Sequence, residues 1–174
     1  DARRSCAFAL AAVAANKGPQ YAALRGAPKV RGVLAALAWI LESHAADPAL
    51  LLPAAGAAAA AARVLPRVNA CAALANLADG DSGNTVAIVQ TPGALRGLVA
   101  AAAQGGSEPL RVHAARALAN LAFFFAARSR VAAADGALPA LAALLQARST
   151  LSRVHAARAL ANLGTNHNAN RKAV

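Results

Sequence analysis

The chain repeats one block of sequence, and this repetition constrains its fold more than any other feature. Residues 111–122 read RVHAARALANLA and residues 153–164 read RVHAARALANLG, so eleven of twelve positions are identical at an offset of 42 residues. Residues 67–78, RVNACAALANLA, form a third copy 44 residues upstream, and residues 3–14, RRSCAFALAAVA, form a more divergent fourth. A period in the forties is typical of a solenoid of stacked helical units. In such arrays each unit buries its apolar side against its neighbours, and an extended surface usually carries the function.

Each repeated block predicts one helix, and two further helical patterns precede it. Apolar residues recur at spacings of three and four within the block, as Val112, Ala115 and Leu118 do. A second pattern begins 18 residues before one block at Gly93 and 17 before the next at Gly136, and glycine suits a sharp bend. Residues 84–90 and 128–134 are helix-compatible runs too short to stand alone. The predicted unit is therefore a short helix, a bend, a second helix, a loop and a third helix.

Polar residues also repeat, on the side of the third helix opposite the apolar stripe. The stripe consists of His113, Arg116 and Asn120 in one copy, His155, Arg158 and Asn162 in the next, and, more loosely, Asn69, Ala72 and Asn76. The sequence of a solvent-exposed helix face would diverge between tandem copies, so the repeated Asn indicates that another group contacts it. The alternative is that a recent duplication copied neutral residues together with the core.

These patterns resemble the armadillo repeat. In that family the third helix carries A-x-x-A-L-x-N-L, which is AARALANL at Ala114 and Ala156 here, and the second helix begins at a turn like the GALP at Gly136. HEAT repeats, the nearest rival, usually lack this Asn and this glycine turn. The resemblance implies an all-α fold, a right-handed armadillo superhelix or α-solenoid of about four repeats, as a fragment of a longer array.

On this interpretation the chain is a single solenoid with one insertion. The expected divisions are the third helix of repeat 1 at residues 2–16, repeat 2 at 17–80, repeat 3 at 81–125, repeat 4 at 126–166 and the start of repeat 5 at 167–174. Asn170 and Arg171 match the Asn-Arg signature of the family's inter-repeat loop. In repeat 2 the interval from the glycine of the second helix, Gly26, to the start of the repeated block at Arg67 is 41 residues, whereas the same interval is 18 and 17 residues in the next two repeats. Repeat 2 therefore carries about 23 extra residues, roughly 43–65, between its second and third helices.

The insertion leaves two interpretations open. It is either a flexible alanine-rich loop or a segment that docks on the solenoid or a partner. The docking residues would be Leu50, Leu51 and Leu52, with Trp39 on the same surface. The other aromatic cluster, residues 123–125, ends a third helix and predicts a core plug or repeat cap.

The resemblance implies that the third helices line a concave groove, in which Asn side chains bind the main chain of an extended peptide. An amide both donates and accepts hydrogen bonds, so it can hold a peptide backbone without distinguishing its side chains. Asn76, Asn120 and Asn162 match these positions, whereas Ala12 takes the place in the first copy.

Arginine in this groove predicts the charge of the ligand. Importin-α-like members place Trp four residues before the Asn, but this chain has Ala72, Arg116 and Arg158 there, which argues against nuclear-import cargo. Guanidinium groups bind carboxylates and phosphates bidentately. The expected partner is therefore an extended acidic or phosphorylated segment, as in β-catenin-like members, with His113, His155 and Asn69 in the same groove. The alternative for the arginines is a solvated face, or coding bias, because only three of 18 basic residues are lysine.

Two other function classes compete with this expectation. One is a structural subunit of a large assembly, for instance cytoskeletal or ciliary, that uses convex or end surfaces. The other is contact with nucleic-acid phosphates, which the net charge of +11 permits, but an aromatic content of 3% offers no repeated stacking platform.

Catalysis, cofactors and metals are not expected. The seven acidic residues do not converge on one site, and Asp79 and Asp81 predict a turn or helix cap rather than a calcium loop. Cys6 and Cys71 are expected to be free thiols in an intracellular, reducing compartment, which suggests a cytoplasmic location, with cytoskeletal, ciliary or nuclear placement as alternatives. No membrane span is expected. The sequence thus predicts a non-catalytic scaffold for protein–protein interaction.

Overall fold

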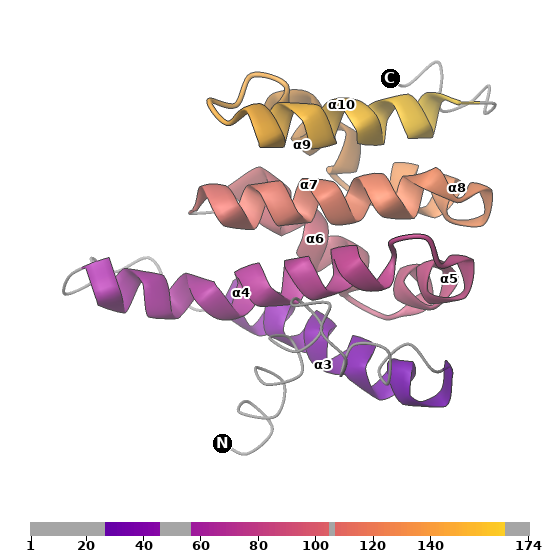
Figure 1. The fold of residues 1–174 in the computed structure, drawn as a ribbon, viewed down its shortest axis with the longest axis horizontal. Coiled ribbons are helices and arrows are strands. Elements are labelled where there is room, and N and C mark those ends of the chain that lie inside the picture. Colours follow the sequence, from indigo (N-terminus) through magenta and orange to yellow (C-terminus); the bar gives the residue numbers. More distant parts are fainter. Residues whose placement is uncertain (1–26, 46–56, 105–106, 166–174) are drawn as a thin grey trace.

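A computed structural model describes residues 27–45, 57–104 and 107–165, and the regular elements in these ranges are all α-helices (Figure 1). The helices are α3 (Ala27–Ala45), α4 (Ala57–Leu77), α5 (Ser82–Gln90), α6 (Ala94–Gln104), α7 (Glu108–Phe123), α8 (Phe125–Ala132), α9 (Ala137–Leu144) and α10 (Thr150–Gly164). The prediction of an all-α fold is confirmed. Residues 2–16 and 167–174, including Ala12, Asn170 and Arg171, lie outside the described residues, as do Cys6 and Leu50, Leu51 and Leu52.

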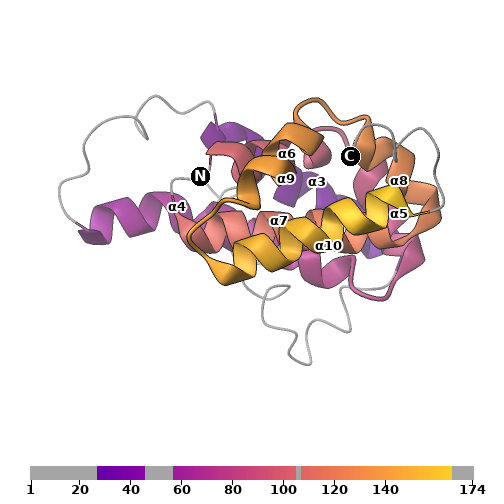
Figure 2. The same cartoon turned by 90° about the horizontal axis from the view of Figure 1, so that it is seen from above.

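The helices stack in two layers. α4, α7 and α10 lie side by side in chain order, and α3, α6 and α9 form the second layer behind them (Figure 1). The shorter helices α5 and α8 contact each other at one end of the stack, as the perpendicular view also shows (Figure 2). Each helix therefore packs mainly against the equivalent helix of the next unit and against its own unit's partners.

Local signals in the sequence set the helix boundaries. The Asp81 side chain accepts a hydrogen bond from the Asn84 backbone nitrogen at 2.8 Å, which caps α5 and confirms the predicted cap. Ser149 caps α10 in the same way through the Ser152 nitrogen. Gly93 and Gly136 have φ of 80° and 73°, a left-handed conformation that glycine adopts without steric cost, so the predicted bends before α6 and α9 are confirmed.

Leucine and alanine build the core between the layers. Leu74, Leu118 and Leu121 are fully buried at the sites where the repeated block predicts apolar contacts. Each such leucine stabilises the fold by roughly 1.5–3 kcal/mol. The many buried alanines carry little apolar surface, but their small side chains allow the helices to approach closely.

The insertion in the second unit is helical at both of its ends. α3 has 19 residues against 11 in α6, and α4 has 21 against 16 in α7, so helix extension accounts for part of the extra length. α4 begins at Ala57 within a run of six alanines and continues through Pro66. A flexible loop is thus the wrong interpretation for residues 43–45 and 57–65, which are helical. The high helix propensity of alanine explains the difference.

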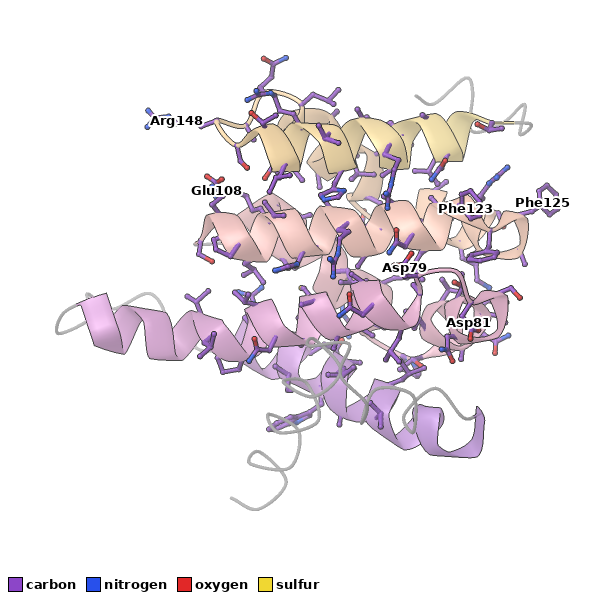
Figure 3. The ribbon with its side chains drawn as sticks, in the orientation of Figure 1. Asp79, Asp81, Glu108, Phe123, Phe125 and Arg148 are labelled. Atoms are coloured by element: carbon purple, nitrogen blue, oxygen red, sulfur yellow. The ribbon has the colours of Figure 1, made fainter. Side chains whose placement is uncertain are left out.

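The phenylalanine cluster does not plug the core. Phe123 is 61% exposed and Phe125 is 69% exposed, so the prediction of a buried plug is wrong for both (Figure 3). Leu121 and Ala122 already complete the buried face of α7, and the helix ends at Phe123. Phe123 instead packs edge-to-face on Phe124, with ring centroids 5.3 Å apart.

Two glycine substitutions test the close packing of α6 on α3. A Cβ at Gly97 would lie 2.6 Å from the Leu41 Cβ, whereas one at Gly32 would meet nothing within 4 Å. We expect Gly97→Ala to lower the free energy of unfolding by about 1–3 kcal/mol through overpacking. Gly32→Ala should raise it by roughly 0.5–1 kcal/mol, because it replaces glycine inside a helix. Urea denaturation measures both, and a neutral Gly97→Ala would show that the two helices are not in close contact.

Candidate interaction site

The predicted polar residues lie on the layer formed by α4, α7 and α10. Asn76 is on α4, Arg116 and Asn120 are on α7, and Arg158 and Asn162 are on α10. Because the three helices stack side by side, equivalent positions become neighbours in space. The side chains at these positions differ in exposure: Asn76 and Asn120 are only 3% and 9% exposed, Asn162 is half-buried, and Arg158 is exposed.

Hydrogen bonds connect these side chains between adjacent units. The Asn120 Nδ2 donates to the Ala75 carbonyl at 2.8 Å, and the Asn162 Nδ2 donates to the Ala119 carbonyl at 3.0 Å. The two carbonyls are equivalent, because Ala75 directly precedes Asn76 in the chain and Ala119 directly precedes Asn120. Each Asn therefore ties its own third helix to the one before it.

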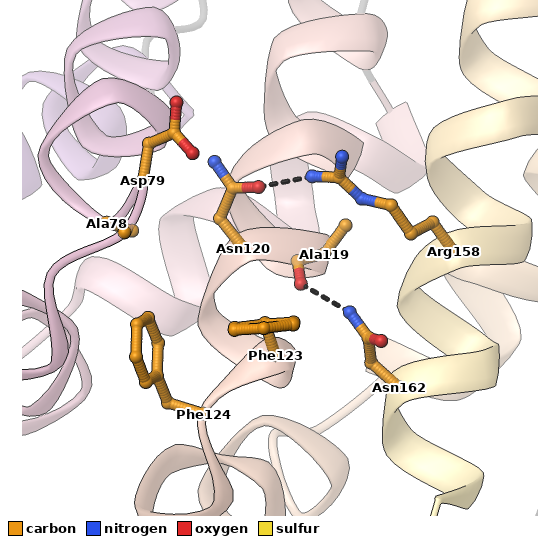
Figure 4. Close-up of a pocket in the computed structure, with 9 residues that line it drawn as sticks. Ala78, Asp79, Ala119, Asn120, Phe123, Phe124, Arg158 and Asn162 are labelled. Atoms are coloured by element: carbon orange, nitrogen blue, oxygen red, sulfur yellow. Dashed lines mark hydrogen bonds between the residues drawn. The ribbon is translucent and has the colours of Figure 1, made fainter.

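The arginines make the complementary bonds to the Asn oxygens. An Nη2 of Arg116 donates to Asn76 Oδ1 at 2.7 Å and, more weakly, to the Ala72 carbonyl at 3.4 Å. Arg158 Nη2 donates to Asn120 Oδ1 in the same arrangement (Figure 4). We call the set Asn76, Arg116, Asn120, Arg158 and Asn162 the Arg-Asn ladder.

The ladder gives the repeated polar residues a role within the chain that the sequence analysis missed. The sequence did carry a signal for this role, because Arg and Asn recur together, four residues apart, in consecutive units. An amide has two N–H donors and two acceptor lone pairs, so the internal bonds use part of the capacity of Asn120. Use of these amides by a partner's main chain stays a prediction. Asn162 is the best placed for it, because no described side chain donates to its Oδ1.

A pocket of about 390 Å³ adjoins the ladder at the ends of α4, α7 and α10 (Figure 4). Its walls combine an apolar part, a carboxylate and a guanidinium group. The lining residues are Ala78, Asp79, Gly80, Ala119, Asn120, Phe123, Phe124, Arg158 and Asn162. The predicted groove residues Asn120, Arg158 and Asn162 are thus brought together, whereas Asp79, Phe123 and Phe124 join them from helix ends and turns, where the repeat pattern carries no signal.

Two histidines, His113 on α7 and His155 on α10, lie close to the arginines of the ladder. Burial lowers the pKa of His113, and the nearby Arg116 lowers it further. Burial likewise lowers the pKa of His155, with further contributions from Arg158, Arg116 and His113. Burial lowers the pKa of Arg116, while Asp79 opposes this effect. These mutual effects show that the two histidines and two arginines share one electrostatic environment across α7 and α10.

The remaining predicted residues lie elsewhere. Asn69 is half-buried on α4, and Trp39 is 41% exposed on α3, in the second layer. Cys71 is a buried free thiol, as predicted, and burial raises its pKa to about 12, so it stays protonated at neutral pH.

Arg128 is a further residue that the sequence analysis missed. Its Nε and Nη2 donate to the carbonyls of Ala122 and Phe123 at 2.9 and 2.8 Å, and its Nη1 donates to that of Thr165 at 3.0 Å. A cation at a helix C-terminus satisfies carbonyls that lack intrahelical partners. Arg128 thereby joins the end of α7 to the end of α10.

Neither a metal centre nor a single membrane-spanning helix is found in the part of the chain that the structure describes. No group of three or more His, Cys, Asp or Glu side chains in those ranges could hold a metal ion. No single described helix is long and apolar enough to cross a membrane, although α5 and α6 together, across a bend of 87°, reach that length and composition.

Comparisons with known proteins support the helical fold and name no function. No protein-family model matches the chain, and no curated protein matches it. A crystal structure of an engineered protein is similar over 97% of this chain and 60% of its own, at 27% identity and a TM-score of 0.67. A second engineered protein is similar over 98% of this chain and 76% of its own, at 26% identity and a TM-score of 0.58. The chain spans about three fifths of the length of the first of these proteins.

Two Asn substitutions measure what the ladder contributes to stability. Asn120→Ala removes a donor to a carbonyl in the preceding helix and the acceptor for Arg158, at a buried position. We expect it to lower the free energy of unfolding by about 1–3 kcal/mol. Asn162→Ala removes the equivalent donor at a half-buried position, where water can replace it, and should cost less than about 1 kcal/mol. Denaturant titration of both variants decides this, and equal losses would contradict the ladder as described.

The histidines predict a pH dependence of stability. The folded state holds the pKa of His113 and His155 below the ordinary value of 6.5, so the unfolded chain binds more protons as the pH falls. Stability should therefore be greatest above about pH 7 and decline toward about pH 5.5, before carboxylates titrate. Urea midpoints across this range measure the effect, and His113→Gln with His155→Gln should flatten it. An unchanged slope in that double variant would assign the dependence to other groups.

Proposed function

We propose that the chain is a non-catalytic protein-interaction scaffold of the armadillo type, whose third helices bind an extended acidic or phosphorylated segment of a partner protein. The observation that carries this proposal is the position of the Arg116 and Arg158 guanidinium groups on the adjacent helices α7 and α10, with Arg158 lining a pocket. A segment lying across the stacked helices would meet equivalent side chains from successive units.

The chemistry of the accessible groups supports an anionic ligand. Arg158 is exposed and has five N–H donors, of which the bond to Asn120 Oδ1 uses one, so the others can reach a carboxylate or phosphate. Asn162 Oδ1 can accept a backbone N–H from the same segment. Asp79 lines the pocket on the side opposite Arg158 (Figure 4), so the negative groups of a partner would lie over α7 and α10.

The aromatic rings beside Arg158 add an apolar contact. Phe123 is 61% exposed and lines the pocket with Phe124. A large exposed ring next to a guanidinium group suits a segment that combines acidic and apolar residues. This favours a peptide over a nucleic-acid backbone as the ligand.

A structural-assembly role is the second candidate, in which surfaces away from the ladder hold neighbouring subunits. The observation in its favour is that Trp39 and Phe125 are 41% and 69% exposed outside the pocket lining. In that case charge reversal on the ladder would leave the partners unchanged.

Matched charge reversals test the proposal. Arg158→Glu and Arg148→Glu alter the net charge equally at exposed positions, but only Arg158 belongs to the ladder and pocket. The probe is a fluorescein-labelled peptide of alternating Glu and Ser, compared with its phosphoserine form and with a Gln-for-Glu form. We expect Arg158→Glu to weaken binding of the acidic forms about tenfold or more, equivalent to about 1.4 kcal/mol, and Arg148→Glu to change it less than about twofold.

Fluorescence anisotropy at low and moderate salt gives the affinities, and circular dichroism establishes that each variant is folded. Equal weakening by both substitutions would show attraction to net charge alone and reject a specific groove site. Equal affinity of the wild-type chain for the Gln form would reject acidic recognition. Duplex DNA as a further competitor distinguishes a phosphate-backbone ligand from a peptide.

A further inference from the structure

The pocket beside the ladder carries charges of both signs. Arg158 lines one side and Asp79 lines the other, with Asn120 between them (Figure 4). Asp79 is exposed and lies just after the end of α4, in the turn that leads to α5. A ligand in this pocket therefore meets a guanidinium group and a carboxylate at the same time. A segment with acidic side chains alone complements only the guanidinium group.

Asp79 adds negative charge where the backbone of α4 is already negative. The peptide dipoles of a helix place partial negative charge at its C-terminus, and the last turn of α4 contains no basic residue. Burial lowers the pKa of Arg116 and Asp79 opposes this effect, so Asp79 and Arg116 interact. A carboxylate has about four lone-pair sites, and Asp79 can therefore accept bonds from a further donor. The carboxylate and the helix end together attract a cation of a ligand.

The phenylalanine rings beside Asp79 suit the rest of a basic side chain. Phe123 and Phe124 both line the pocket, packed edge-to-face, and Phe123 is 61% exposed. The face of an aromatic ring attracts cations. The aliphatic stem of arginine or lysine also covers apolar surface while its charged head reaches a polar partner. One basic side chain therefore complements the exposed ring and the carboxylate together.

The charge at this position differs between units, unlike the ladder. Asp79, Phe123 and Thr165 directly follow the three matched blocks, so a carboxylate stands there in only one of them. Arg116 and Arg158 are instead equivalent, and a segment held by the ladder alone has similar contacts when it shifts by one unit. A contact that occurs once fixes the position of the segment along the stacked helices.

We propose that this pocket selects a partner segment in which an arginine or lysine lies close to an acidic residue. The acidic group binds Arg158, and the basic head binds Asp79 with its stem over Phe123. This inference rests on the proposed function and specifies the sequence that the partner carries. A cavity of about 390 Å³ is about 9 Å across if spherical, which corresponds to roughly three residues of extended chain. We therefore expect the two charged residues within about three positions of each other.

Other occupants complement the pocket less well. A phosphate backbone or another purely anionic ligand would bring like charge against Asp79. A metal ion would find one carboxylate among the lining residues, whereas divalent cations in proteins take several such ligands. Neither of these ligands makes use of the exposed Phe123 ring. A short segment with both charges complements all three walls.

Three fluorescein-labelled peptides with the same Gly-Ser tail test the proposal. The first alternates Glu and Ser, the second has Arg in place of one central Ser, and the third carries that Arg at the far end of the tail instead. Attraction to net charge alone predicts equal affinity for the two Arg peptides, both weaker than the first. We expect the central-Arg peptide to bind about fivefold more tightly than the tail-Arg peptide in fluorescence anisotropy.

Matched substitutions assign this preference to the pocket. Asp79→Asn removes the charge and keeps the size, so the preference should fall below about twofold. The same variant should bind the purely acidic peptide as tightly as the wild-type chain or more so, because a negative charge is gone. Asp135→Asn is the control, an exposed carboxylate in the turn before α9 and outside the pocket lining, and should keep the preference. Circular dichroism establishes that each variant is folded.

The outcomes separate this inference from the proposed function. If the wild-type chain binds both Arg peptides equally, or if Asp79→Asn keeps the preference, the pocket does not select a basic residue, although the acidic peptide still binds at Arg158. Equal loss of the preference in Asp79→Asn and Asp135→Asn would assign it to net charge and also reject the pocket. If none of the three peptides binds, the proposed function and this inference both fail.

Discussion

The packing of each third helix against the next is the contact on which the rest of this structure depends. Beyond its packing on α6 of its own unit, α7 is buried by α4 on one side and by α10 on the other. Alanine at the contact positions lets these helices approach closely, and this approach brings Asn120 within hydrogen-bonding distance of Ala75 and Arg158. Small apolar residues thus place the polar ladder, and the ladder in turn fixes the register between units.

Under the proposed function, this arrangement would couple stability to recognition. The same Arg and Asn side chains that join neighbouring helices are those that the armadillo-like pattern assigns to a partner. A buried Asn120 with both ends of its amide in use is chiefly a connector, whereas Arg158 and Asn162, at the more open end, retain capacity for a ligand. A substitution in the middle of the ladder therefore reports on folding first, and one at the open end reports more directly on binding.

Prediction from sequence succeeded where the signal is local and failed where it depends on neighbours. The glycine bends at Gly93 and Gly136 and the cap at Asp81 follow from backbone conformations that few residues favour, and they are confirmed. The phenylalanines at the end of this third helix were predicted to be a core plug or a repeat cap, but Phe123 and Phe125 are exposed, whereas Leu121 and Ala122 just before them are buried. The alanine-rich insertion was interpreted either as a flexible loop or as a docking segment, yet its ends extend α3 and α4.

The sequence by itself determined that this chain is a helical array of repeated units, because apolar spacing and glycine positions act locally and the same block recurs along the chain. It also determined which polar residues recur. Only the tertiary structure decided what those residues do, because an Asn on a helix has the same local conformation whether it faces solvent, a peptide or a neighbouring carbonyl. The contact of Asn120 with Ala75 joins residues 45 positions apart, and such a partner is defined by how the helices stack.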